Sequence, residues 1–510
     1  MVVQHNMQAA NANRMLGITS GAQAKSTEKL SSGYKINRAA DDAAGLTISE
    51  KMRKQIRGLD KASSNAQDGV SSVQTAEGAL TEVHSMLQRM NELAVQASNG
   101  TNSKDTDRKA IQDEIDQLNT EIDRVAETTK FNEIYLLKGD DGEKTVNMNA
   151  HDAGLKGTLT DNGDGTATFT MKELNDGDTV SIGGKNYTIG SKEADAKALI
   201  EAPANGDPDK TFTIGDKTFK VKANGDVCDK DGNKLYVKTA GGATAAEAFD
   251  TSKELTTDST FKNNANTDTA NTAVTVANLK DYVKGGVKVS DGTTTMTVLT
   301  DAKDAAGADG VDDNDTSVIT KQKAYELAGK ELLAANQIGD TEGHASVTNG
   351  DGTGLAFNAG NGTFKINVGQ AKVANTLSFS LHVGADADMT NKITVDIDTM
   401  NSANLGIKGL NVTDKNGSAA TYAIDAISDA ISKVSSQRSA LGAVQNRLEH
   451  TIDNLDNISE NTSSAESRIR DTDMAKEMVN YSKNNILAQA GQSMLAQANQ
   501  SNQGVLSLLQ

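Results

Sequence analysis

The clearest pattern along the chain is a series of apolar residues spaced three or four positions apart, which begins near Asp41. Ser, Gln, Glu, Lys and Asn fill most of the positions between them. This spacing is typical of a long amphipathic helix that buries one narrow seam, as in a coiled coil. The pattern stops at Asn99-Gly100, a common C-terminal helix signal. We therefore predict one long helix between these two points.

Two further stretches have the same spacing. The first runs from Ile111 to Val125, and the short polar connection before it predicts an antiparallel neighbour of the long helix. The second runs from Ile424 to Ile458, near the other end of the chain, with Arg438 as its charged interruption. Because each helix has only one narrow seam, we expect the three to pack together as a bundle. The predicted seam residues include Leu80, Leu87, Ile115, Leu118, Leu441 and Leu448.

The terminal segments, Val2 to Leu30 and Ile469 to Leu509, are weakly amphipathic and rich in Ala, Asn, Gln and Ser. The second segment carries an apolar stripe that has no partner inside the predicted bundle. This segment is too polar to span a membrane and too marginal to be stable as a lone helix. We expect another protein chain to cover the stripe. Its residues are Met474, Met478, Ile486, Leu487, Met494 and Leu495.

The middle of the chain, roughly Gly139 to Met400, is rich in Thr, Val, Gly and Asp and predicts short strands between tight turns. Thr179–Ile189 and Thr211–Val221 form an internal repeat in which a two-residue turn joins two strands. Short helical runs are expected at 193–202 and 244–249, and a strand at 234–238. We predict small β-rich modules inserted into a helical rod, one or two domains in all with two favoured.

The composition changes the range of possible functions. The chain of 510 residues has no Trp, only 3% aromatic residues and 45 Gly, which suits thin helical packing better than a core around a deep catalytic pocket. Its net charge of −18 argues against binding to nucleic acid or to an anionic membrane surface. The N-terminus has no basic segment followed by an apolar one, so we expect no cleaved secretory signal.

Candidate chemistry is sparse. The single cysteine, Cys228, excludes an internal disulfide, and none of the 6 His lies in a His-Glu-x-x-His motif. Asp229–Lys234 begins like a calcium loop but lacks Gly at the sixth position and Glu at the twelfth, so a hairpin turn is expected. The acidic stretch Asp309–Asp315 is expected to be a solvated loop rather than a cation site. We predict no catalytic residues, no metal and no cofactor.

Both ends of the chain resemble the bacterial flagellin family, while the middle carries no family signature. The resemblance rests on long, ordered motifs, with Arg470 as a departure because many members have an acidic residue there. At the N-terminal side the motifs are Leu30–Leu46 and Leu87–Gln96, and at the C-terminal side Ser467–Ala475, Leu495–Gln500 and Val505–Leu509. The last of these adds Leu508 and Leu509 to the expected assembly residues.

The resemblance implies a multidomain subunit that polymerises with itself into the flagellar filament for motility. Residues 1–40 and 460–510 would pair in the filament core, 41–140 and 401–459 would form the helical bundle, and 141–400 would project outward. It also implies export of the unfolded chain by the flagellar type III machinery with a chaperone, folding beneath a cap, and an extracellular location. A hook-associated junction protein remains the closest alternative, whereas a metalloprotease in the middle region or a membrane-bound adhesin fits less well.

The resemblance further implies a host partner, the Toll-like receptor for flagellin. Arg89, Leu93 and Glu114 match the contact motif for this receptor in the family. Arg89 and Glu114 lie beside the seam and are expected to be exposed on one face of the helical hairpin. Leu93 is adjacent to the seam residue Ala94, so packing inside the bundle is an equally good reading of its role.

Overall fold

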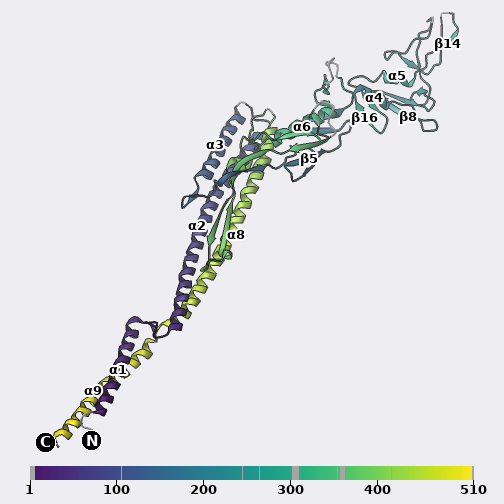
Figure 1. Ribbon diagram of the computed structural model, residues 1–510. Coiled ribbons are helices and arrows are strands. Elements are labelled where there is room, and N and C mark those ends of the chain that lie inside the picture. Colours follow the sequence, from purple (N-terminus) through teal and green to yellow (C-terminus); the bar gives the residue numbers. More distant parts are fainter. Residues whose placement is uncertain are drawn as a thin grey trace. The chain divides into compact units, whose positions relative to one another are not determined.

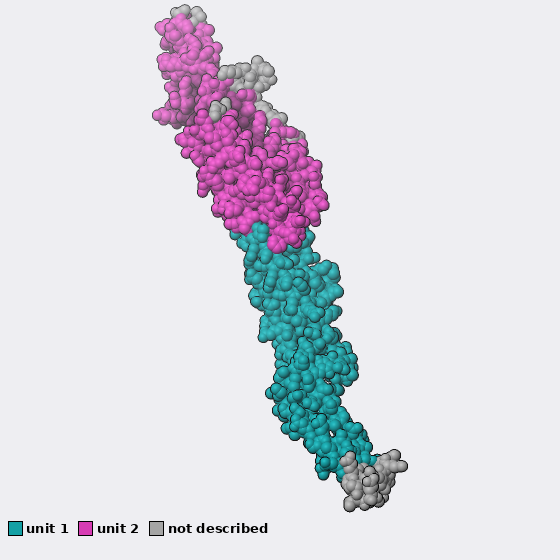
Figure 2. Space-filling view, turned by 90° about the vertical axis from the view of Figure 1, so that its left-hand side faces the viewer, with its two compact units in different colours: residues 1–77, 378–396, 438–510 teal, residues 78–377, 397–437 magenta. Residues whose placement is uncertain are grey.

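The computed structural model describes residues 6–507 with gaps at 105, 244, 264, 301–308, 353, 356–361 and 415. The chain divides into two compact units (Figure 2). Unit 1 comprises Met1–Glu77, Ser378–Asp396 and Arg438–Gln510, and unit 2 comprises Gly78–Leu377 and Ile397–Gln437. Two long helices, α2 (Ala43–Ser98) and α8 (Ser418–Arg470), contribute residues to both units. Helical ends around a strand-rich middle are therefore confirmed, while the finer domain boundaries stay a prediction.

In unit 1 the first part of α2 lies beside the last part of α8, although the two are far apart in the sequence (Figure 1). Leu441 and Leu448 on α8 are 1% and 0% exposed, as the seam spacing predicts. Two serines interrupt the apolar seam on α2. Ser49 donates to Glu466 Oε1 and Ser63 donates to Asp456 Oδ1, each at 3.0 Å. These bonds satisfy the buried hydroxyls and fix the register of the two helices.

A β-hairpin covers this pair of helices. It consists of β21 (Leu377–His382) and β22 (Lys392–Ile397), and Val383 and Ile393 share an apolar core with residues of α2 and α8. The Asn65 side chain donates to the His382 carbonyl oxygen at 3.0 Å. Residues 378–396 thus group with the helices of unit 1, although the predicted outer region of 141–400 includes them.

The terminal segments form two paired helices, α1 (Met7–Ser32) and α9 (Met474–Ser507), which lie side by side (Figure 1). Asn6 caps α1, because its Oδ1 accepts a hydrogen bond from the Ala9 backbone N–H at 2.9 Å. The Asn6 Nδ2 also donates to the Ala498 carbonyl oxygen at 3.1 Å, which joins the start of α1 to α9. Gly33, at φ 77°, ends α1 in the left-handed conformation that favours glycine.

In unit 2, α3 (Asp107–Thr128) follows α2 and packs its apolar face inward. Leu80, Leu87 and Ile115 are all 0% exposed. Leu118 differs from the expected seam because it is only half-buried. The buried face of α3 instead follows Ile111, Ile115, Ile122 and Ala126, and Leu118 lies at the edge of that face. The short helix α7 (Ser402–Leu405) joins the group, since its Ser402 N–H donates to Asp123 Oδ1 at 2.7 Å.

The strand-rich part of unit 2 begins with an antiparallel pair, β3 (Asp140–Asn147) and β20 (Gln370–Asn375). A second core lies between two sheets and the helix α6 (Lys321–Asn336), and it contains Phe169, Leu332 and Phe364. The four-stranded sheet has the order β18-β19-β5-β4, and the three-stranded sheet has the order β17-β7-β6. Their bounds are Gly157–Asp161 (β4), Thr166–Met171 (β5), Thr179–Ile182 (β6), Lys185–Gly190 (β7), Val318–Thr320 (β17), Ser346–Asn349 (β18) and Thr363–Asn367 (β19).

A further module with its own core, which includes Phe212, Phe219 and Val289, is inserted within this region. The chain enters and leaves it at one place, because the Ser191 N–H donates to the Thr297 carbonyl oxygen at 2.8 Å. Its main sheet has the order β10-β9-β8-β15-β16, and two short ladders pair β11 with β12 and β13 with β14. The bounds are Glu193–Leu199 (α4), Lys210–Ile214 (β8), Lys217–Val221 (β9), Val227–Cys228 (β10), Tyr236–Val237 (β11), Leu255–Thr256 (β12), Thr260–Lys262 (β13), Asp268–Ala270 (β14), Val276–Lys280 (α5), Lys288–Ser290 (β15) and Thr295–Thr297 (β16).

Both predicted hairpins of the internal repeat are present, β6–β7 and β8–β9. Gly183 and Gly184 both have positive φ (55° and 73°), as a type I′ turn requires, whereas in the second turn only Gly215 does (59°). The helical run expected at 244–249 is wrong for residues 245–249, which are irregular, and residue 244 lies outside the described residues. There the Glu247 backbone bonds to the side chains of Thr239 and Thr272, which replaces helical hydrogen bonding.

Candidate functional site

The paired terminal helices expose most of their large apolar side chains. Met474, Met478, Ile486, Leu487 and Met494 are each between 47% and 67% exposed, while Leu495 is half-buried. Leu508 and Leu509 lie outside the described residues. α1 adds three exposed residues that the sequence reasoning missed, namely Met7, Met15 and Ile18.

The inner face of this helix pair is made of small side chains. Among the side chains of the pair that the structure describes, the buried ones are Ala9, Ser26, Ala488 and Ala498, each no more than 9% exposed. The small residues let the helices approach closely, and the large apolar residues therefore point outward. An ordinary amphipathic pair has the opposite arrangement. Many exposed large apolar side chains on one helix pair are a mark of a protein–protein interface.

The connection between the terminal helices and the bundle is held by a compact group around Arg470. The Lys35 N–H donates to the Arg470 carbonyl oxygen at 2.6 Å, and the Thr472 N–H donates to the Gly33 carbonyl oxygen at 2.9 Å. The Arg470 guanidinium lies 4.8 Å from the Tyr34 ring centroid and pairs with Glu50 Oε1 at 2.6 Å. Arg470 stands where the resembling motif often has an acidic residue. Its positive charge is balanced here by the Glu50 carboxylate and by the face of the Tyr34 ring.

The hairpin of α2 and α3 presents the residues that match the receptor motif. Arg89 Nε lies 2.9 Å from Glu114 Oε1, and Arg89 Nη1 lies 3.2 Å from Glu92 Oε2. The side chains of Arg89 and Glu114 are 50% and 44% exposed. The hydrogen bond with Glu114, followed by that with Glu92, raises the pKa of Arg89. The structure therefore brings Arg89 and Glu114 together on one exposed surface.

Leu93 does not join that surface. Its side chain is 2% exposed and lies in the buried seam with Met90 and Ala94, each 0% exposed. Of the two readings of Leu93, the structure supports packing inside the bundle. Leu93 as a receptor contact stays a prediction that its burial does not favour, because a side chain this deeply buried offers little surface to a partner.

A buried arginine fixes the hairpin that carries this surface, and the sequence reasoning missed it. Arg108 is 1% exposed. Its Nε donates to the Ala97 carbonyl oxygen at 2.8 Å, its Nη2 to the Asn99 carbonyl oxygen at 3.2 Å, and its Nη1 to the Asp414 carbonyl oxygen at 2.8 Å. The first two bonds lie at the end of α2, where helix carbonyl groups lack partners within the helix, and the third joins this end to the segment before α8. A lone Arg in the first turn of a helix gives no sequence signal of such burial.

The acidic segments around Asp229 and Asp312 form turns. Asp229 Oδ1 accepts hydrogen bonds from the backbone N–H groups of Asp231 and Asn233, at 3.0 and 2.8 Å, so the expected hairpin turn is correct. In the acidic stretch, Asp312 is 5% exposed and accepts the Thr300 N–H at 2.7 Å. That part of the loop is therefore internally bonded rather than solvated. Within the described residues, no group of three or more His, Cys, Asp or Glu could hold a metal ion, and no helix is long and apolar enough to cross a membrane.

Comparison with known proteins identifies similar chains over the full length. Family models for the bacterial flagellin N-terminal and C-terminal helical regions match residues 3–141 and 424–509. Flagellin from Clostridium tyrobutyricum is 36% identical over 99% of this chain and 100% of that protein. Flagellin from Salmonella choleraesuis (strain SC-B67) is 34% identical over 100% and 99%. The solved flagellar hook associated protein-3 from Legionella pneumophila covers 82% of this chain and 98% of that chain at 14% identity, but its TM-score of 0.30 does not bear on the function.

Proposed function

The chain belongs to the bacterial flagellin family and is a structural subunit of the flagellar filament rather than an enzyme, and we propose that its paired terminal helices carry the main contacts of the polymer. This proposal rests on the exposed large apolar side chains of α1 and α9. Each Å² of apolar surface removed from water contributes about 25 cal/mol, so docking of this surface onto neighbouring subunits would stabilise the polymer. The experiment is seeded elongation by the purified chain, followed by electron microscopy.

In this proposal the bundle formed by α2, α3 and α8 is the next layer of the subunit, and the strand-rich middle projects outward. The buried seam is consistent with a rigid bundle. The separate core of the inserted module is consistent with an outer region that assembly does not need. Residues Ser191 and Thr297 are hydrogen-bonded neighbours at its entry and exit. The module can thus be removed without opening a long gap in the remaining core.

Replacing residues 193–296 with a short Gly-Ser linker is expected to leave seeded elongation intact. The module has a separate apolar core, so its removal exposes little of the core that contains Phe169 and Phe364. Filaments of the deletion variant should be thinner in electron micrographs, with bundle helicity unchanged by circular dichroism. A folded deletion variant that fails to elongate seeds would show that the outer module takes part in assembly.

Export as an unfolded chain through the flagellar type III machinery, with a chaperone and an assembly cap, also belongs to this proposal. It is supported by the flagellin resemblance and by the exposed apolar helices, which gain a partner only when the subunit docks. The resulting location is extracellular, in the filament. A hook-associated junction protein is the alternative, and it would fail to build a long filament from its own subunits.

The exposed Arg89–Glu114 pair is proposed as part of a contact with the host Toll-like receptor for flagellin. Arg89→Ala is expected to raise the Kd for the receptor ectodomain by about tenfold, because Arg residues with several hydrogen bonds often dominate such contacts. Binding of the monomeric variant by surface plasmon resonance provides the measurement. Helicity and seeded elongation should stay unchanged, since the Arg89 side chain is half-exposed.

Arg124→Ala is the matched control for this measurement. Arg124 also lies on the hairpin, and its Nη2 pairs with Glu121 Oε1 at 2.5 Å while its side chain is 59% exposed. Loss of that ion pair should leave receptor affinity near the parent value. Equal Kd values for the parent, Arg89→Ala and Arg124→Ala would remove Arg89 from the proposed contact.

A further inference from the structure

Exposed large apolar residues outside the terminal helices are few, and most of them gather at two places. Among the described residues of the rest of the chain they are Ile48, Val95, Ile134, Tyr135, Met389 and Ile458. Ile134 and Tyr135 are adjacent on a small hairpin of unit 2. Ile458 lines a groove of unit 1, and Met389 directly precedes Thr390, another residue of that groove. A repeated head-to-tail contact requires two different patches on each copy, because one patch binds the next copy and the other binds the previous copy.

The hairpin, here called the knob, consists of β1 (Lys130–Phe131) and β2 (Ile134–Tyr135). Its two turn residues, Asn132 and Glu133, have φ of 45° and 68°, which is the geometry of a tight type I′ turn but is strained for a residue such as Glu. Leu136 and Leu137, at 1% and 0% exposure, anchor the base of the knob in the core. Ile134 and Tyr135 are nevertheless 44% and 43% exposed. The knob thus presents two exposed apolar side chains beside a turn that carries the Glu133 carboxylate.

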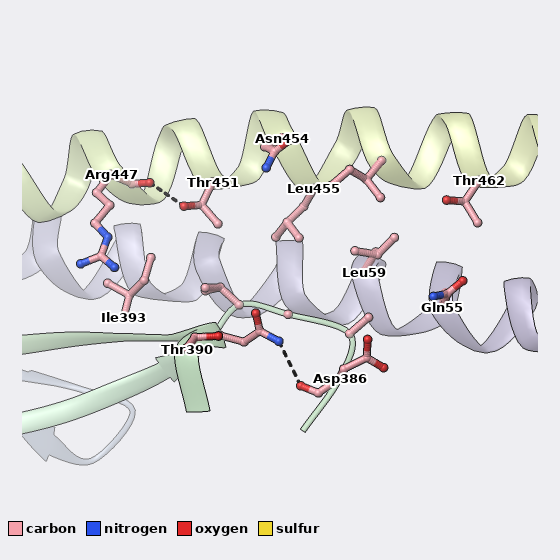
Figure 3. A pocket seen from close by; sticks show the side chains of 15 residues that line it. Gln55, Leu59, Asp386, Thr390, Ile393, Arg447, Thr451, Asn454, Leu455 and Thr462 are labelled. Carbon is pink, nitrogen blue, oxygen red and sulfur yellow. Dashed lines mark hydrogen bonds between the residues drawn. The ribbon is translucent and has the colours of Figure 1, made fainter. Parts of the chain in front are cut away.

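The groove lies between the β21–β22 connection and the helices α2 and α8, and has a volume of about 470 Å³ (Figure 3). Leu59, Ile393 and Leu455 form an apolar floor, and Ile458 adds a side chain that is 42% exposed. Arg447 and Asp386 supply one positive and one negative charge at its rim. Within the described part of the chain, neither of these two side chains forms an ion pair.

The shape of the groove is fixed before any partner binds. A Cβ on Gly58 would lie 2.9 Å from the Ala385 Cβ, so this glycine lets the β21–β22 connection lie directly on α2. The Asn391 Nδ2 donates to the Asp386 carbonyl oxygen at 3.2 Å, and this bond links two residues within the β21–β22 connection. A preformed receiving surface avoids the ordering cost that weakens contacts made by mobile loops.

We propose that the knob of one subunit docks into the groove of a second copy of this chain in the filament. The inference rests on the proposed polymerisation. Apolar residues meet apolar residues, with Ile134 and Tyr135 facing Leu59, Leu455 and Ile458. The charges also match, because Glu133 at the knob tip meets Arg447, and Lys138 at the knob base meets Asp386. Charge complementarity of this kind sets the register of an interface and disfavours wrong partners.

Charge reversal tests the pairing in the full-length chain. Glu133→Arg and Arg447→Glu are each expected to raise the lowest protein concentration that elongates seeds by about tenfold, since each places like charges together. The double variant restores opposite charges and should return to within about twofold of the parent. Asp216→Arg is the matched control, because Asp216 is an exposed acidic residue in the two-residue turn between β8 and β9, and it should leave elongation unchanged.

The possible results distinguish failure of the docking from failure of the proposed polymerisation. A parent chain that fails to elongate seeds would count against polymerisation itself. If the parent elongates and both single variants elongate equally well, or if the double variant stays as impaired as the singles, the knob does not dock in the groove.

An oxidised filament of the Ile134→Cys, Ile458→Cys double variant gives a second readout. It should run as a ladder of linked chains in a denaturing gel, whereas each single variant stays monomeric; an unlinked double variant would also overturn the docking. Cys228 is 0% exposed, so it does not contribute links.

Discussion

Leu441→Asp is expected to lower the free energy of unfolding of the helical bundle by about 4 kcal/mol or more. The Leu441 side chain is 1% exposed in the seam between α8 and α2. The substitution removes its apolar contacts and places a carboxylate at a position that is closed to solvent. The carboxylate must either remain charged in the apolar seam or take up a proton, and both cost free energy. Urea denaturation followed by the helical circular dichroism signal measures the effect.

Ala440→Asp is the matched control for this substitution. Ala440 is the neighbouring residue on the same helix, but it is exposed, so the new carboxylate stays in water. We expect its unfolding midpoint to stay close to that of the parent chain. If Leu441→Asp and Ala440→Asp unfold alike, the seam does not stabilise the bundle as its burial indicates.

Removal of residues 492–510 is expected to abolish filament elongation at any concentration at which the full chain elongates seeds. The truncation removes Met494, which is 65% exposed, and the contact between Asn6 and Ala498 that joins the ends of α1 and α9. Without these groups the terminal helices lose apolar surface for neighbouring subunits and part of their pairing. The bundle seam lies outside the deleted segment, so its helicity should persist. Sedimentation after seeding, with circular dichroism of the monomer, provides the measurement.

The variant lacking residues 193–296 is the comparison for this truncation, because it loses far more of the chain but none of the terminal helices. It should elongate seeds while the shorter C-terminal truncation does not. Long filaments from the chain lacking residues 492–510 would mean that the C-terminal end of α9 is not an assembly element.

The long helices and most of their buried seam could be predicted from the sequence, because a three-four spacing of apolar residues directly reports one buried helical face. The same rule explains Leu93, which lies next to Ala94 in the spacing and is buried. It fails at Leu118, which lies at the edge of the buried face of α3 and is only half-buried. How much of a helix face its neighbours cover is a tertiary property that local spacing does not contain.

The segment 378–396 shows a second limit. β22 alternates exposed and buried residues like any half-buried strand, so the sequence grouped it with the strand-rich middle. Its buried face contacts the surface of two helices, and alternation alone does not reveal whether the covering layer is a sheet or a helix. The burial of Arg108 was likewise invisible, because its partners are backbone carbonyl groups, which every sequence contains.

Only part of the outward apolar face of the terminal helices could be predicted from the sequence. The stripe on α9 stands out through its Met, Ile and Leu residues, whereas Met7, Met15 and Ile18 on α1 are diluted by many Ala, Asn and Gln residues. Small residues on the inner face signal close helix contact only once the partner helix is known. The pairing of α1 with α9 therefore required the structure.

Electron microscopy of the purified full-length chain after addition of short filament seeds tests the central claim most directly. Because the exposed apolar faces of α1 and α9 are expected to dock onto neighbouring subunits, the chain should extend the seeds into long filaments without any other protein. Growth should depend on protein concentration and should stop when free subunits reach a constant level. Seeds that keep their original length in the presence of folded, concentrated full-length chain would contradict the account of this protein as a self-assembling filament subunit.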